Sequence, residues 1–81
     1  MIEIIFDEKE KKSVAYDNHN RIGECDFIET DDYWNIVHTQ VEHSYQGQGI
    51  AKKLVESIME NAKKSHKKLI AECSYAKKII Q

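Results

Sequence analysis

Hydrophobic and polar residues alternate, or β-branched and aromatic residues cluster, in several short segments of the first half of the chain. Such segments are typical of strands that bury one face, and they predict strands over residues 2–6, 13–16, 22–28 and 33–41. The links between them are short and polar, and two of them, 17–20 and 29–32, carry the Asp and Asn residues that turns favour. Strands joined in this way predict an antiparallel meander.

The hydrophobic period changes after Gly49. Apolar residues then recur every three or four positions, at Ala51, Leu54, Val55, Ile58, Met59 and Ala62. This spacing predicts an amphipathic helix of about four turns, whose apolar side packs on the sheet. Lysine and glutamate residues occupy its opposite side.

Strand character returns after the helix, over residues 69–73. A strand, a crossover helix and a second strand form one unit, so the strands at 33–41 and 69–73 are predicted to be parallel. Residues 74–80 predict a short helix that the Ser74 side chain can cap. The predicted fold class is α/β, or α+β by some definitions. It is a mixed, mostly antiparallel five-stranded sheet with one parallel pair, one main amphipathic helix packed on it and a short C-terminal helix.

The length of 81 residues predicts a single domain, 1–81, because so short a chain supports only one hydrophobic core. No apolar run approaches the roughly 18 residues that cross a bilayer, and no basic region precedes an apolar stretch at the N-terminus. We therefore expect a cytoplasmic protein with no membrane partner, and expect Cys25 and Cys73 to be free thiols. No His and Cys cluster has the spacing of zinc ligands, so no metal is expected.

Charge is divided unevenly between the two halves of the chain. Residues 1–43 hold four basic and eleven acidic side chains, a formal charge of −7, whereas residues 44–81 hold eight basic and three acidic ones, a charge of +5. This asymmetry favours an anionic ligand at the C-terminal half, although the lysines can equally serve to solvate a helix face. Aromatic residues are not interleaved with the lysines, so nucleic acid is not an expected partner.

Two of the three glycines, Gly47 and Gly49, stand directly before the main helix. A helix N-terminus has unpaired N–H groups and a partial positive charge, and glycine lets a ligand approach the backbone closely. The pair therefore predicts a phosphate site, with a tight strand-to-helix turn as the alternative. The P-loop motif is absent, and the Rossmann form GxGxxG fails because Lys52 stands where its third glycine belongs.

The six residues Gln46-Gly47-Gln48-Gly49-Ile50-Ala51 resemble the Q/R-x-x-G-x-G/A signature of the GNAT superfamily of acyl-CoA-dependent N-acetyltransferases. The order of strand, signature, helix and strand is similar too, and the whole chain looks like the small single-domain YjdJ-type branch, a minimal GNAT fold. The resemblance implies that the backbone amides of these six residues, with Lys52 beside them, hold the pyrophosphate of coenzyme A. It also implies that the pantetheine arm pairs with the backbone around Val41 and Glu42.

The resemblance implies an enzyme that transfers an acetyl group from acetyl-coenzyme A, its cosubstrate, to an amine of a small molecule or protein. The acidic N-terminal half favours a cationic acceptor such as a polyamine or a lysine side chain. We expect a monomer or weak homodimer. The alternative is a non-catalytic module that binds coenzyme A or a protein partner.

Amine acetylation needs a neutral amine, a polarised thioester and a proton for the departing thiolate. Tyr75 resembles in its location the tyrosine that many GNAT enzymes use as proton donor, with a packed aromatic residue as the alternative. Cys73, at the end of a strand near the expected thioester, is a nucleophile or acid if its pKa is lowered, and otherwise a packed strand residue.

Two further residues are candidates for the general base. His38 alternates with Trp34, Ile36 and Gln40 along the strand at 33–41, which predicts that the four side chains share one face. A structural histidine is the alternative. Glu42 resembles in its position the acid that some GNAT members use as base.

Overall fold

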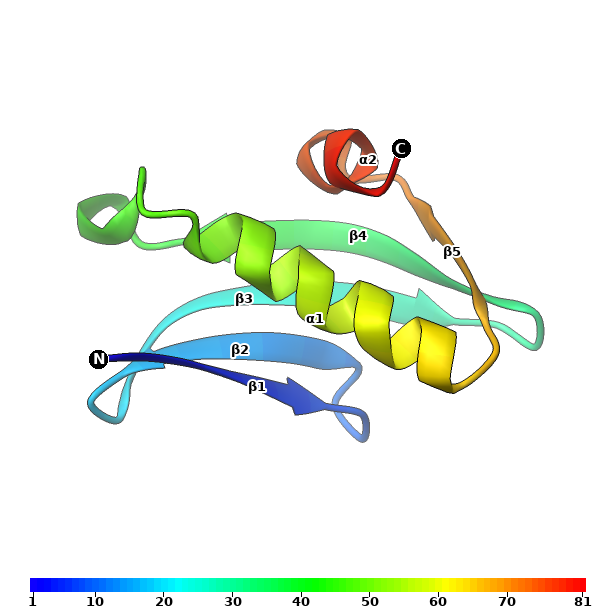
Figure 1. The fold of residues 1–81 in the computed structure, drawn as a ribbon, viewed down its shortest axis with the longest axis horizontal. Coiled ribbons are helices and arrows are strands. Elements are labelled where there is room, and N and C mark those ends of the chain that lie inside the picture. Colours follow the sequence, from blue (N-terminus) through cyan, green and yellow to red (C-terminus); the bar gives the residue numbers. More distant parts are fainter.

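The structure, a computed structural model, describes all residues 1–81. Four strands form an antiparallel meander and a fifth pairs in parallel with the fourth, in the sheet order β1-β2-β3-β4-β5 (Figure 1). The strands are β1 (Ile2–Asp7), β2 (Lys12–Asp17), β3 (Asn20–Glu29), β4 (Tyr33–Val41) and β5 (Lys68–Ala71). The predicted mixed sheet with one parallel pair is confirmed.

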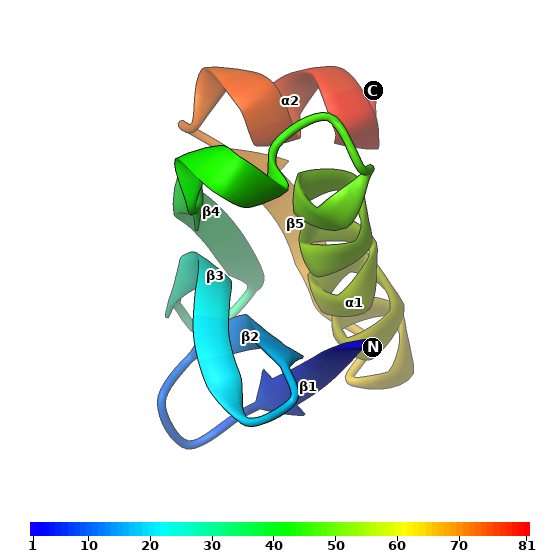
Figure 2. The same cartoon turned by 90° about the vertical axis from the view of Figure 1, so that its left-hand side faces the viewer.

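In Figure 2, α1 (Ile50–Lys64) lies against one face of the sheet, and α2 (Ser74–Ile80) crosses beside the edge formed by β4 and β5, where it also contacts α1. The hydrophobic period predicts α1, and α2 was also expected as a short helix. A short 3-10 helix, η1 (His43–Tyr45), precedes α1 and was not predicted. The expectation that Ser74 caps α2 was wrong: the N-cap is Cys73, and no side chain caps this helix.

The apolar side of α1 supplies the centre of the core. Its buried residues are Ile50, Leu54, Val55, Ile58 and Ala62, and they pack against buried residues of the sheet. The Ser13 hydroxyl of β2, itself buried, donates to the carbonyl oxygen of Leu54 over 2.8 Å and ties the helix to the sheet. No helix is long and apolar enough to cross a bilayer, and no group of three or more His, Cys, Asp or Glu side chains is arranged to hold a metal ion.

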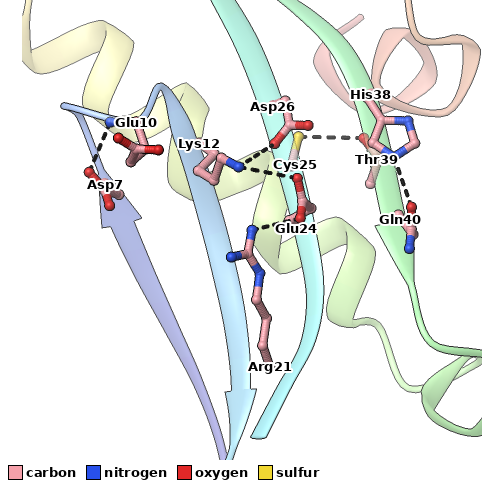
Figure 3. A network of polar contacts seen from close by, with 10 residues as sticks. All are labelled: Asp7, Glu10, Lys12, Arg21, Glu24, Cys25, Asp26, His38, Thr39 and Gln40. Atoms are coloured by element: carbon pink, nitrogen blue, oxygen red, sulfur yellow. Dashed lines mark hydrogen bonds and ion pairs between the residues drawn. The ribbon is translucent and has the colours of Figure 1, made fainter. Parts of the chain in front are cut away.

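The other face of the sheet carries no helix and is lined by charged and polar side chains (Figures 2 and 3). Lys12 Nζ lies 3.4 Å from Glu24 Oε2 and 3.8 Å from Asp26 Oδ1, and Arg21 contacts Glu24 over 2.6 Å. Burial, together with the neighbouring Glu24, raises the pKa of Asp26. We call this surface the open face.

A β-bulge in β4 reverses the direction of its side chains. Asp26 of β3 pairs with His38 and Phe27 pairs with Ile36, so Val37 is an extra residue in β4. As a result His38 is exposed on the open face, whereas Ile36 is in the core. The expectation that His38 shares a face with Trp34 and Ile36 was wrong, because side chains alternate regularly only in an unbulged strand.

Candidate functional site

The link from β4 to α1 depends on glycine for its backbone conformation. Gly47 and Gly49 have φ angles of 83° and 78°, in the left-handed region that glycine adopts most easily. A Cβ built on either residue would meet no atom within 4 Å, so the space in front of both is open. We call residues 46–49 the glycine loop.

The N–H groups of the glycine loop and of the first turn of α1 are largely without partners. Gly49 is the N-cap of α1, and no side chain caps the helix. The N–H groups of Gly47, Gln48 and Gly49 donate no hydrogen bond to any backbone or side-chain acceptor of the protein. The first N–H groups of a helix lack intrahelical acceptors and lie at its positive end, so the site is suited to an anion.

A cavity of about 510 Å³ opens in front of these groups. It is lined by Thr39, Val41, Tyr45, Gln46, Gly47, Gly49, Ile50, Ala51 and Tyr75. Six of the eight residues expected to bind coenzyme A are in this list, while Gln48 and Lys52 are not. The cavity therefore extends from the glycine loop, past the end of β4, to α2.

The edge of β4 beside the cavity is free because β5 diverges from it (Figure 1). Their pairing ends at Ile36, whose carbonyl oxygen accepts hydrogen bonds from the N–H groups of both Glu72 and Cys73. Farther along, the Glu42 N–H donates to β3, so strand alternation directs the backbone groups of Thr39 and Val41 to the free edge. An extended ligand can pair with this edge as a strand would.

A side-chain clamp holds the end of β5 at the point of divergence. The buried Asn35 donates from Nδ2 to Glu72 Oε1 over 2.7 Å, and its Oδ1 accepts the Glu72 N–H over 3.1 Å. The clamp fixes the residue immediately before Cys73.

The Thr39 hydroxyl lies against both cysteine sulfurs. Its Oγ1 is 3.5 Å from Cys73 Sγ and 3.4 Å from Cys25 Sγ. Cys25 is fully buried, and this burial raises its pKa to about 12. Burial also raises the pKa of Cys73, but the nearby backbone N–H groups of Ala76 and Tyr75 and the Thr39 hydroxyl, which favour the thiolate, outweigh it, and the net pKa lies below the ordinary value.

The four predicted catalytic residues fall into two groups. Tyr75 lines the cavity, and Cys73 is one hydrogen bond away from it through Thr39. His38 instead contacts Gln40 over 3.1 Å on the open face, and the exposed Glu42 is the N-cap of η1 outside the cavity lining.

Two contributors to the site were not predicted. The extra residue Val37 shifts the alternation of side chains along β4, and Thr39 faces the cavity as a result. No feature of the sequence marks this bulge. Tyr45 of η1 lines the cavity and donates from its hydroxyl to Asp17 Oδ2 over 2.6 Å, which lowers the pKa of Asp17 and raises that of Tyr45. This bond secures the glycine loop to β2.

Residues 12–81 match a family model described as GCN5-related N-acetyl-transferase. The solution structure of a GCN5-like protein from Staphylococcus aureus is 35% identical, with a TM-score of 0.72; the match covers 96% of this chain and 76% of that one. Among curated proteins, none matches the sequence.

Larger proteins share the fold. A ribosomal-protein-alanine N-acetyltransferase from Brucella melitensis biovar Abortus 2308 is 25% identical with a TM-score of 0.67, and the match covers 74% of this chain but only 47% of that one. A GNAT family acetyltransferase from Elizabethkingia anophelis, solved with acetyl-CoA bound, is 23% identical with a TM-score of 0.69. That match covers 85% of this chain and 48% of the neighbour.

Proposed function

The chain belongs to the GCN5-related N-acetyltransferase family, and from this premise we propose that it transfers an acetyl group from acetyl-coenzyme A to an amine. The observation that carries the proposal is the row of unpaired N–H groups beside an open cavity at the start of α1. These donors suit the two negative charges of a diphosphate.

The rest of the cavity suits the rest of the cosubstrate. The free edge of β4 offers the backbone groups of Thr39 and Val41 to the amide-containing pantetheine arm. An arm that follows this edge away from the glycine loop ends beside Tyr75 and Cys73. The neighbour from Elizabethkingia anophelis, which has the same fold and was solved with acetyl-CoA bound, supports the assignment of this ligand.

Within this arrangement Tyr75 is our proposed proton donor to the departing thiolate. It lines the cavity and is 40% exposed, so a bound ligand can reach its hydroxyl. Cys73 has a second proposed role, as a nucleophile that accepts the acetyl group before the amine does, because its lowered pKa favours the thiolate. His38 and Glu42 stay candidates for the base, although both lie outside the cavity.

The first prediction concerns turnover. Release of free thiol from acetyl-coenzyme A, measured across a panel of polyamines, amino acids and lysine peptides, is expected to identify at least one acceptor. Tyr75→Phe removes the proton donor and should lower kcat by about 10²-fold or more. Tyr33→Phe, which alters another exposed tyrosine outside the cavity lining, is the matched control and should leave kcat unchanged.

Cys73→Ala separates the two chemical routes. Loss of turnover with intact acetyl-coenzyme A binding would support transfer through Cys73, whereas retained turnover would leave direct attack by the amine. Binding of acetyl-coenzyme A without thiol release for any amine would contradict the transferase proposal and favour a non-catalytic coenzyme A-binding module.

A further inference from the structure

We propose that Cys73 is a modification site at which coenzyme A, held in the cavity, becomes attached through a mixed disulfide. The inference rests on the proposed function, because it requires coenzyme A to occupy the cavity. It goes beyond that function, because the product is a covalently blocked protein rather than an acetylated amine.

The layout of the cavity places the far end of a bound coenzyme A arm near Cys73, which lies next to the lining residue Thr39. The glycine loop and its unpaired N–H groups are at one end, and Tyr75 is at the other. Thr39 lies along the wall between them, with its Oγ1 3.5 Å from Cys73 Sγ. A ligand whose diphosphate is fixed at the glycine loop and whose arm follows the free edge of β4 therefore carries its terminal thiol toward Cys73.

The surroundings of the two cysteines make the attachment selective. Cys73 is partly exposed and its surroundings lower its pKa, so a larger fraction of it is thiolate than of an ordinary cysteine at the same pH. Cys25 is fully buried with a pKa of about 12 and stays a thiol. The Thr39 hydroxyl contacts both sulfurs, and a direct bond between Cys25 and Cys73 would have to displace it. The thiol best placed to react with an oxidised Cys73 is consequently that of the ligand.

The chemistry requires a peroxide as oxidant. The Cys73 thiolate attacks one peroxide oxygen, the O–O bond breaks, and Cys73 becomes a sulfenic acid while the released hydroxide takes up a proton to form water. The thiolate of coenzyme A then attacks Cys73 Sγ, an S–S bond replaces the S–O bond, and the second hydroxide leaves as water. In total, two thiols lose two hydrogens and one peroxide is reduced to two waters.

The attached coenzyme A would occupy the cavity. Acetyl-coenzyme A could then not bind until a thiol reductant cleaved the disulfide. Such attachment is a reversible way to stop turnover under oxidising conditions and to protect Cys73 from irreversible oxidation.

The test is to treat the whole reduced protein with hydrogen peroxide in the presence of coenzyme A, or of glutathione at the same concentration. Intact mass is then measured without reductant. We expect the addition of one coenzyme A moiety, removed by dithiothreitol, at a rate at least about tenfold above that with glutathione, because binding raises the local thiol concentration. Peptide mapping of the wild-type protein should place the adduct on Cys73, independently of any variant.

Variants then separate binding from reactivity. Cys73→Ser should abolish the adduct and Cys25→Ser should retain it. Gly49→Glu, which places a carboxylate where the diphosphate would lie, should remove the preference for coenzyme A while glutathione still reacts with Cys73. A Cys25–Cys73 disulfide, an adduct on Cys25, or equal rates with coenzyme A and glutathione would each overturn the inference.

A calorimetric titration of the reduced protein with acetyl-coenzyme A distinguishes the two proposals. Binding without preferential attachment of coenzyme A would refute the modification site alone. Absence of binding would refute the modification site and the proposed function together.

Discussion

The three glycines are required for two different reasons, packing at Gly23 and backbone conformation at Gly47 and Gly49. A Cβ on Gly23 would lie 3.0 Å from the carbonyl oxygen of Gln40, so this residue is small because of packing. Gly47 and Gly49 have open space around them but positive φ angles, which cost another L-residue about 1–2 kcal/mol. The glycine loop therefore keeps glycine for a backbone shape that leaves its N–H groups beside the cavity unpaired.

The Thr39 hydroxyl can exchange hydrogen bonds with the sulfur atoms of Cys73 and Cys25. With Cys73 protonated, its thiol donates to Thr39 Oγ1. When Cys73 ionises, the hydroxyl can turn and donate to the thiolate, while Cys25, still a thiol, donates to Thr39 in its place. The hydroxyl thus stabilises the charged form of Cys73, which is one cause of its lowered pKa.

This change of hydrogen-bond donors at Thr39 predicts how the alkylation of Cys73 depends on pH. The folded protein lowers the pKa of Cys73, so its reaction with iodoacetamide should reach half its maximal rate at a lower pH in the folded protein than in the unfolded chain. Thr39→Val removes the donor, so the midpoint should move to higher pH, whereas Thr39→Ser should restore it. Rates measured by mass spectrometry from about pH 6 to pH 10 check this; identical midpoints for wild type and Thr39→Val would contradict it.

At the scale of elements, the site exists because β4 changes partners along its length. The first part of β4 pairs with β3 and β5, and the part beyond Ile36 pairs with β3 alone. The bulge at Val37 and the clamp between Asn35 and Glu72 are close to this transition. One strand therefore contributes to the core with its first half and to the cavity with its second.

The clamp predicts a measurable cost when it is removed. Asn35→Ala deletes two hydrogen bonds to Glu72 and should lower the free energy of unfolding by about 1–2 kcal/mol, measured by urea denaturation. It should also slow Cys73 alkylation in the native state, because the end of β5 is no longer fixed.

Asn61→Ala is the matched control for this change. It deletes one hydrogen bond from an asparagine to the Ser57 carbonyl oxygen within α1 and should leave the reactivity of Cys73 unchanged. If Asn35→Ala and Asn61→Ala affected Cys73 equally, the clamp would have no role in positioning it.

At the scale of the whole molecule, the sequence was sufficient for the fold, while the binding site that it predicts at the glycine pair stays a prediction. Apolar residues spaced two apart predict the strands, and apolar residues spaced three or four apart predict α1. The glycine pair before α1 predicts the loop. The bulge could not be predicted, because one extra residue within an apolar run leaves the composition of the strand unchanged. Its consequences, the exposure of His38 and the position of Thr39 at the cavity, were missed for the same reason.

Negative and positive charges are concentrated in different parts of the molecule. Residues 1–43, with their net negative charge, form the whole meander from β1 to β4, and the open face includes Glu24 and Asp26. The C-terminal half, with its net positive charge, supplies the glycine loop and α1. An anion is thus attracted to the side of the molecule on which the unpaired N–H groups are found.

The central claim, that main-chain N–H groups at the start of α1 grip a diphosphate, is tested most directly by amide NMR spectra recorded during titration with coenzyme A. We predict that the largest shifts occur at Gly47, Gly49 and the first turn of α1, with smaller shifts at Thr39 and Val41, and that inorganic pyrophosphate reproduces the first set but not the second. Shifts confined to the open face around Lys12 and His38, or none at saturating coenzyme A, would contradict it.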